Sequence, residues 1–333
     1  MLSLLLLVLP FTIVAQDLIE VARVNDQFEN INRIFVQGDF CKRSITQGDT
    51  VAVKGALKTN KQIEGYAIAT EVIEGQLKVE VQKPKSGWTT HAGIIEVTLP
   101  DGIALEVVSS SGYITIKGVN GTSLEAKSKS GKIVAEQLQG EVSLHSRSGS
   151  IKVDAIEGPL SMSTKTGEQV ARHIKGDVSM QSTKGALIIE DIKGGLTTVS
   201  TEGAQTIKEV VGDIQIKTMS GALKLSNATG HVQSQTGAGT LNLFDVTGVF
   251  NLMSTKGSVI GTRVKFLESS TINTTEGKIK LKLENKKEEL SFMCQSEHAY
   301  IVAFGKSKKK KLKTGDGAIV ITAVSTTGAQ NYY

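Results

Sequence analysis

Candidate catalytic chemistry starts with the carboxylates of the chain. Hydrolysis of a glycosidic bond needs two carboxyl groups facing each other across the substrate, and metal-assisted hydrolysis needs a base beside a bound metal. In the central part of the chain Asp154 and Glu209 stand alone, while Glu190 and Asp191 form one adjacent pair. Such spacing is typical of solvated positions on an outward face. We therefore predict no catalytic residue and no enzymatic activity.

The histidines are too dispersed for a metal site. They are His91, His145, His173, His231 and His298, and the middle three fall 14, 6 and 10 residues after the first glycine of their own repeat unit, described below. The Gly-Gly-x-Gly-x-Asp motif of calcium-binding β-rolls does not occur. We predict no metal ligand and no cofactor.

Two cysteines, Cys41 and Cys294, are the only residues that could form a disulfide. Two cysteines do not make a disulfide framework. A disulfide requires Cα atoms within about 7 Å, and the architecture argued below places these residues near opposite ends of a long body. We expect two unpaired, buried thiols.

One charged tract could bind a ligand. Six lysines occur within eight residues: Lys306, Lys308, Lys309, Lys310, Lys311 and Lys313. The structural interpretation is a solvated turn between two C-terminal strands, in which lysines discourage pairing with other strand edges. The functional hypothesis is contact with an anionic surface, such as lipopolysaccharide, teichoic acid or phospholipid headgroups.

Composition narrows the class of protein. Among 333 residues there are 34 glycines but only 4 prolines, and hydrophobic residues make up 39% against 21% charged residues. This balance excludes a disordered chain, and the absence of a Gly-X-Y period excludes collagen. The formal net charge of +5 is mild and not concentrated, so we predict no nucleic-acid partner.

The chain opens with an apolar run from Leu2 to Ala15. At about 1.5 Å per residue this run is too short to cross a hydrocarbon core of about 30 Å comfortably. It predicts a secretory signal peptide over residues 1–15, cleaved near Ala15–Gln16. The alternative is a buried N-terminal strand. No later segment could span a membrane, so we expect an exported protein that is periplasmic, cell-surface or secreted.

A strong internal repeat organises the rest of the chain. One glycine recurs at spacings of 19, then 18 seven times, then 20 residues, and a second series runs midway between the first. The first series is Gly112, Gly131, Gly149, Gly167, Gly185, Gly203, Gly221, Gly239, Gly257 and Gly277. The second series is Gly121, Gly140, Gly158, Gly176, Gly194, Gly212, Gly230 and Gly248. Nine units of two halves therefore lie between Gly112 and Gly277.

Between the glycines, apolar and polar residues alternate with period two, which is the pattern of strands with one buried face. The seventh residue after each first-series glycine is apolar in all nine units, for example Leu138, Ile156 and Ile174. Residue types that recur at one register predict stacked coils about 4.8 Å apart. The fold class is therefore all-β, a β-solenoid of about nine 18-residue coils. The alternative is a series of antiparallel hairpins.

A hydroxyl stands three residues before every first-series glycine: Ser109, Ser128, Ser146, Thr164, Ser182, Ser200, Thr218, Thr236, Ser254 and Thr274. This column continues the inward alternation, so we expect its side chains to point into a corner of the coil. There they would satisfy the turn backbone or the next layer. The glycine that follows would allow positive φ where the chain reverses. Because these hydroxyls fall on the inward side of the alternation, we do not expect an outward-facing threonine ladder of the kind that binds ice.

The two ends are less regular. Residues 17–106 still alternate but lose the glycine spacing, and we predict an irregular N-terminal β cap leading into the solenoid. The repeats occupy residues 107–283, and residues 284–333 are predicted to form a C-terminal β cap. Caps of this kind shield open strand edges from other molecules.

The repeat, read as S/T-x-S/T-G followed by alternating apolar positions, stands behind the apolar leader and the segment GDTVAVKGA. Together they resemble the bacterial putative-adhesin family, the Toastrack-like group of β-strand-repeat domains of unknown function. The resemblance covers roughly residues 30–330. It implies an exported, single-stranded β-helix in a cell-envelope context, and it implies no catalytic or binding residue.

These observations predict a non-enzymatic, exported protein that presents long, regular faces. The first expectation is an adhesin-like protein or cell-envelope scaffold that binds surface glycans, lipids or proteins. One alternative is a sensory or regulatory envelope ectodomain acting through a protein partner. A second is a β-helix enzyme acting on polysaccharide, but seven consecutive units without an insertion leave no loops to wall a cleft.

Overall fold

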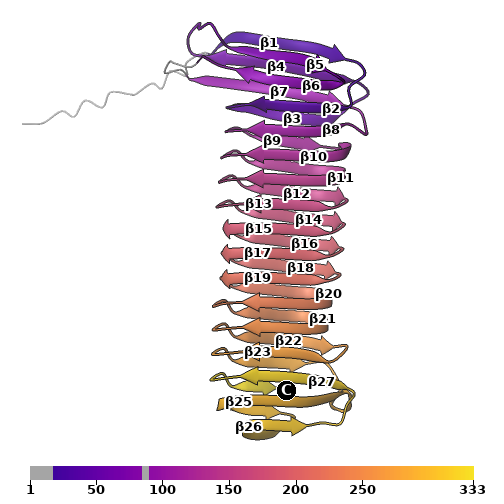
Figure 1. The fold of residues 1–333 in the computed structure, drawn as a ribbon, viewed down its shortest axis with the longest axis vertical. Helices are drawn as coiled ribbons and strands as arrows, with labels where there is room; N and C mark the ends of the chain where they lie inside the picture. Colours follow the sequence, from indigo (N-terminus) through magenta and orange to yellow (C-terminus); the bar gives the residue numbers. More distant parts are fainter. Residues whose placement is uncertain (1–17, 85–89) are drawn as a thin grey trace, which may run out of the picture.

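The computed structural model describes residues 18–84 and 90–333, which form 28 strands and one short 3-10 helix, Lys287–Glu289. The strands stack into a long rod (Figure 1). The predicted signal peptide, residues 1–15, lies outside the described residues. Within the described part of the chain, no helical segment has the length and apolar character that a membrane crossing requires.

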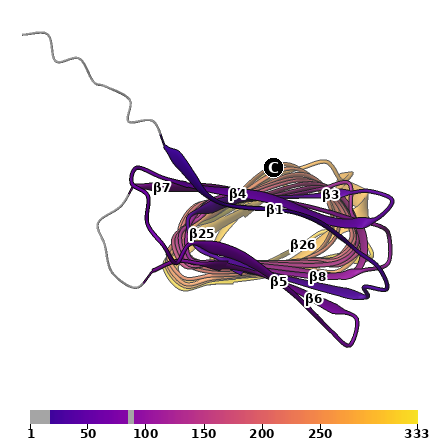
Figure 2. The same cartoon turned by 90° about the horizontal axis from the view of Figure 1, so that it is seen from above.

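Each coil contributes one strand to each of two walls, so the rod is a flattened tube when seen along its axis (Figure 2). Wall 1 is built from the half-units after the first-series glycines: β9 (Ile114–Lys117), β12 (Ile151–Glu157), β14 (Gln169–Lys175), β16 (Leu187–Lys193), β18 (Gln205–Val211), β22 (Val259–Phe266), β24 (Ile279–Leu283) and β28 (Gln330–Tyr332).

Wall 2 is built from the second half-units: β8 (Ala104–Ser109), β10 (Asn120–Ser128), β13 (Leu160–Thr164), β15 (Val178–Lys184), β17 (Leu196–Glu202), β19 (Ile214–Ser220), β23 (Ser270–Thr274) and β27 (Ile319–Ser325). Four long strands pass from one wall into the other: β11 (Ile133–Ser146), β20 (Leu223–Thr236), β21 (Leu241–Ser254) and β25 (Leu290–Ala303).

Pairing between coils follows the repeat. Ile156 pairs with Ile174, and Ile174 pairs with Ile192, in parallel strands that are 18 residues apart in the sequence. This register confirms the predicted β-solenoid. The hairpin alternative is wrong, because the repeat strands β8 to β24 pair with one another in parallel.

The predicted core positions are inside the rod. The apolar residue seven places after each first-series glycine is at most 2% exposed in every unit: Val119, Leu138, Ile156, Ile174, Ile192, Val210, Ala228, Val246 and Val264. Each lies directly over its counterpart, so the core is a continuous apolar column. Burial of these side chains is the main stabilising contribution between coils.

Each coil bends at a residue that the sequence did not reveal. The residue just before this core position has a positive φ of 53–58° in eight units: Gln137, Ala155, His173, Asp191, Glu209, Asn227, Asp245 and Arg263. The pairing register skips this residue, as between Glu136–Asp154 and Leu138–Ile156. The left-handed conformation turns the end of each wall 1 strand toward the corner of the coil.

The structure corrects the expected reason for the first glycine series. Only Gly112, Gly203 and Gly221 of that series have φ in the left-handed region. At the others the constraint is space, because a Cβ on Gly149 or Gly257 would overlap the carbonyl oxygen of the glycine one coil earlier. The turns therefore stack too closely for any side chain. Positive φ is instead common in the second series, from Gly140 to Gly230.

At the N-terminal end both walls continue through seven strands: β1 (Ile19–Phe28), β2 (Arg33–Gly38), β3 (Cys41–Gln47), β4 (Val51–Thr59), β5 (Ala67–Ile73), β6 (Gln76–Gln82) and β7 (His91–Leu99). Wall 1 runs from β9 through β3, β7 and β4 to β1. Wall 2 runs from β8 through β2 and β6 to β5. The outermost strands are thus β1 and β5.

The C-terminal end is closed by a hairpin of β25 and β26 (Lys306–Thr314). The first half of β25 pairs with β27 on wall 2, and its last residues pair with β28 on wall 1. The predicted lysine turn is wrong, because all six lysines lie in strand β26. Pairing with β25 holds the tract extended on both sides of Lys310, where φ is 68° and the register shifts, even though the tract lacks an alternating apolar pattern.

Candidate functional site

The outward surfaces of the two walls differ in charge. Wall 1 carries ladders of opposite charges on successive coils, such as Glu190 with Lys208 at 2.8 Å and with Arg172 at 3.4 Å. On wall 2, one outward position is a hydroxyl or amide in nine consecutive coils: Ser143, Ser161, Ser179, Thr197, Gln215, Gln233, Asn251, Thr271 and Thr322. This column of wall 2 is therefore uncharged and polar over nine coils.

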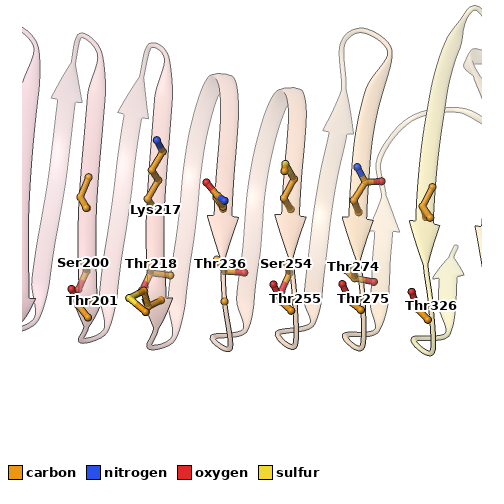
Figure 3. Close-up of a pocket in the computed structure, with 17 residues that line it drawn as sticks. Ser200, Thr201, Lys217, Thr218, Thr236, Ser254, Thr255, Thr274, Thr275 and Thr326 are labelled. Carbon is orange, nitrogen blue, oxygen red and sulfur yellow. The ribbon is translucent and has the colours of Figure 1, made fainter.

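A groove runs along the axis of the rod at the margin of wall 2, where the strands enter the first-series turns. It has a volume of about 750 Å³. One side is formed by Val199, Lys217, Gln235, Met253, Asn273 and Val324, and the other by Thr201, Met219, Gly237, Thr255, Thr275 and Thr326. Figure 3 shows the labelled hydroxyl residues arriving from successive coils.

The floor of the groove is part of the hydroxyl column. Ser200, Thr218, Thr236, Ser254 and Thr274 line it. All ten hydroxyl residues of the column are buried, which confirms that they face inward: Ser109, Ser128, Ser146, Thr164, Ser182, Ser200, Thr218, Thr236, Ser254 and Thr274.

Most of these hydroxyls bond to the turn backbone two or three residues later, and in the described part of the chain none bonds to the backbone of the next layer. The Ser254 and Thr274 hydroxyls donate to the carbonyl oxygens of Gly257 and Gly277 at 2.7 and 2.8 Å. In the early coils the direction reverses, and the Gly149 N–H donates to Ser146 Oγ at 2.9 Å. The hydroxyls of Ser200 and Thr236 have no hydrogen-bond partner among the described residues. The column therefore fixes the turns that border the groove.

The chemistry of the groove is neutral. Its lining holds hydroxyls, two amides, two methionines and two valines, with Lys217 as the one charged residue and no carboxylate. Met219 is 68% exposed and Met253 is 42% exposed, so each offers an apolar surface beside the hydroxyls. Across residues 18–84 and 90–333, no three His, Cys, Asp or Glu side chains are placed to hold a metal ion.

Four of the candidate residues lie close together on wall 1, where His173 is near Asp154, Glu190 and Asp191. His173 Nδ1 is 2.6 Å from Asp154, and this hydrogen bond raises the pKa of His173. His145 contacts the hydroxyls of Ser143 and Ser163.

The remaining histidines lie elsewhere. His231 is 3.2 Å from Asp213, His298 is 3.8 Å from Glu297, and the ring of His91 packs on Phe40 near the N-terminal end. Each is a local surface contact.

Both cysteines are free and buried, at opposite ends of the rod, as predicted. Burial raises the pKa of the Cys41 thiol to about 11 and that of Cys294 to about 12. Cys41 lies near Arg43, a fully buried guanidinium that donates to the Cys41 carbonyl and the Ser109 hydroxyl, both at 2.9 Å. Because neutral thiols are poor nucleophiles, neither cysteine is placed for chemistry.

The six lysines of β26 are all exposed, on the strand that ends the rod. Lys309 Nζ lies 4.9 Å from the ring centre of Tyr300, and no carboxylate in the described residues pairs with any of the six.

The groove is the feature that sequence reasoning missed. Two sequence patterns could have indicated the groove. They are the threonines that follow residues of the hydroxyl column and the uncharged outward column of wall 2.

Three solved structures are similar to this chain. A putative cell adhesion protein from Clostridium sporogenes is 11% identical, with 93% of this chain and 98% of that chain covered and a TM-score of 0.22. A putative adhesin from Bacteroides fragilis is 13% identical, with 81% and 98% covered and a TM-score of 0.32. A putative adhesin from Parabacteroides merdae is 13% identical, with 78% and 95% covered and a TM-score of 0.31.

No model of a known protein family matches the sequence, and no curated protein matches it. At the TM-scores above, the solved structures add nothing about a ligand.

Proposed function

We propose that this is an adhesin-like, non-enzymatic protein of the cell exterior that binds an extended, uncharged polysaccharide along the groove of wall 2. The observation that carries the proposal is the groove itself, which is continuous over six coils and lined by hydroxyls and amides with a single charge. From Thr201 to Thr326 the groove spans five coil spacings, or about 24 Å. This length suits a chain molecule better than a small ligand.

The lining favours a neutral glycan over an anionic polymer or an acyl chain. Sugar hydroxyls both donate and accept hydrogen bonds, and so do the threonines, Gln235 and Asn273. An anionic ligand would call for several cations, but Lys217 is the single one here. An acyl chain would leave the hydroxyls and amides of the groove unpaired, which costs free energy. The two methionines can pack against the C–H faces of sugar rings.

A binding role is favoured over catalysis by the residues that face the groove. Glycoside hydrolysis needs a carboxylic acid on each side of the scissile bond, and the lining contains neither aspartate nor glutamate. The same short turns repeat in every coil, so the groove is shallow and open. These features support capture of a polymer along the rod without its cleavage.

The proposal is tested by titrating purified protein against a panel of neutral and anionic polysaccharides. Thr255→Arg combined with Thr275→Arg would fill the groove with long charged side chains. We expect this variant to lose at least about tenfold in affinity for the neutral polysaccharide that the wild type binds, or about 1.4 kcal/mol. The matched control is Thr206→Arg with Thr229→Arg, which places the same groups at exposed positions away from the groove.

Three outcomes would count against the proposal. The wild type could bind no neutral polysaccharide in the panel, or the groove variant could bind as well as the control. The third outcome is release of new reducing ends during incubation, which would identify an enzyme.

A further inference from the structure

The two ends of the rod leave strand edges that are open for pairing. At the C-terminal end, β26 pairs with β25 alone among the described strands. Because β25 passes from wall 2 to wall 1, residues 311–314 of β26 end wall 2 and residues 306–309 end wall 1. At the N-terminal end, β1 pairs only with β4 and β5 only with β6 in the described part of the chain. Each end thus offers one free edge per wall.

The charges at these edges have opposite sign. The C-terminal edge carries six exposed lysines. At the N-terminal edge, Arg23 is paired with Glu20 on the same strand at 2.8 Å. The exposed charges left on β1 and β5 are Asp26 and Glu71, for which the described residues provide no ion pair within 4 Å. The N-terminal edge is therefore acidic.

On wall 1 the complementary charges point toward the interior of the rod. Lys308 lies opposite Ile301 and Lys306 opposite Ala303, and both partners are fully buried. Directly opposed residues share one face of an antiparallel pair, so these lysines are on the core side of the last strand. Asp26 lies opposite the buried Val53 in the same way.

On wall 2 the complementary charges point outward. Lys311 lies opposite the exposed Gln295, and Lys313 lies opposite the exposed Met293. Glu71 lies opposite Lys78, whose neighbours along β6 are buried, so Glu71 also faces outward. On each wall the lysines and the carboxylate thus occupy corresponding faces.

We propose that copies of this protein join end to end, with β26 of one copy paired to β1 and β5 of the next. Lysines on an edge prevent that edge from pairing with its own kind, and the same holds for the acidic edge. Charge complementarity therefore selects the joining of unlike ends. Contact between unlike ends is heterologous and does not close on itself, so it produces linear filaments. Val72 and Ile73 of β5, 47% and 58% exposed, would be covered by the contact.

The test measures molar mass by light scattering across a range of protein concentrations at low and high salt. Wild-type protein should form species that grow with concentration and dissociate as salt screens the charges. Lys306→Glu, Lys308→Glu, Lys311→Glu and Lys313→Glu together leave four glutamates against two lysines on β26 and so give a copy with two acidic ends. Asp26→Lys with Glu71→Lys gives a copy with two basic ends. Each variant alone should remain monomeric, and an equimolar mixture of the two should assemble again.

A shaft variant, Lys165→Glu with Lys193→Glu, Lys224→Glu and Lys256→Glu, makes the same charge change at exposed positions between the ends and should assemble like the wild type. The proposal is overturned if the wild type stays monomeric at every concentration and salt, if either end variant assembles alone, or if the mixture stays monomeric. Should the acidic-ended variant fail to fold, replacing all six lysines of β26 with Gln removes the positive charge of this edge. That variant should also remain monomeric, and its assembly would overturn the proposal.

An anionic surface is the other occupant that the lysines could meet. Sedimentation with vesicles of phosphatidylserine and phosphatidylcholine, against phosphatidylcholine alone, distinguishes it. A monomer that binds only the anionic vesicles would replace end-to-end joining with surface contact. The groove of wall 2 ends at the coil of β27, which β25 separates from β26, and its lining contains none of the residues changed at the ends. Polysaccharide binding can therefore succeed or fail independently of this result.

Discussion

A side chain on Gly257 would overlap the carbonyl oxygen of Gly239, which lies one coil earlier in the stack. The same relationship links successive first-series glycines along the rod, such as Gly149 with Gly131. Glycine is thus required at these turns mainly by the close approach of two backbones.

Gly257→Ala should destabilise the protein by about 1–3 kcal/mol, because the turn must move away from the coil below to admit a methyl group. Denaturant unfolding measures the loss. Gly195→Ala is the matched control, since the nearest atom to its Cβ would be a rotatable carboxylate oxygen of Asp177 at 3.1 Å. Equal stability of the two variants would contradict the packing argument.

The hydroxyl column allows a paired test of hydrogen bonding. Ser254→Ala removes the bond to the Gly257 carbonyl and should cost about 1 kcal/mol of unfolding free energy. Ser200→Ala removes a buried hydroxyl that has no partner among the described residues, so it should be neutral or stabilising. Urea midpoints of the two variants give the comparison, and a larger loss for Ser200→Ala would refute it.

The pKa of His173 should depend on its hydrogen bond to Asp154. The hydrogen bond to Asp154 raises the pKa of His173 above its ordinary value of 6.5, and Asp191 and Glu190 add smaller contributions. The folded state therefore holds this proton more tightly than the unfolded state. The resulting stability is fully present below pH 6.5 and is lost as pH rises through the folded pKa.

An NMR titration of the histidine ring protons measures this pKa directly. Asp154→Asn should lower the pKa of His173 toward 6.5. Asp213→Asn, which removes the carboxylate beside His231, should leave His173 unchanged. An unchanged His173 titration in Asp154→Asn would show that the hydrogen bond is not the cause.

The buried thiols should resist alkylation in the folded protein. With the pKa of Cys41 raised to about 11 and that of Cys294 to about 12, both remain neutral at mildly alkaline pH. Mass spectrometry after iodoacetamide treatment should show no modification of native protein and two modifications of unfolded protein. Thr255→Cys places a thiol at an exposed position and should add one rapid modification.

The same thiols should lower the stability of the folded protein as the pH rises above 9. The unfolded thiols ionise near their ordinary pKa of 9.0, while the folded ones do not. Above pH 9, ionisation of the thiols therefore stabilises the unfolded state relative to the native state, and the free energy of unfolding falls. Replacing both cysteines with Ala or Ser should reduce the loss of stability between pH 9 and 10, and an unchanged slope would contradict it.

The sequence predicted the period, the fold class and the inward faces, because each of these repeats in every coil. It did not predict the left-handed bend, since that position accepts Gln137, Ala155 and Arg263 as well as the Asn and Asp that favour this conformation. Nor did it place the lysines on a strand. The register of β26 is imposed by β25, because the six lysines show no alternation of apolar and polar residues that would predict a strand.

The groove could not be predicted because it joins residues that are far apart in the chain. Thr326 comes after the β25–β26 hairpin and is therefore far from Thr275 in the sequence. Its N–H nevertheless donates to the Thr275 carbonyl at 3.0 Å. Only the return of β27 onto β23 adds this sixth coil to the groove. The uncharged column of wall 2 was visible in the sequence, but its meaning depended on knowing which side of the strands faces solvent.

The parallel ladders between coils have a mechanical consequence. Their hydrogen bonds run along the length of the rod, because the strands themselves lie across it. Tension applied between the two ends would load a few of these bonds at a time and peel the layers apart in sequence. A protein attached at one end and pulled at the other would thus lengthen in steps of one coil and yield gradually under load.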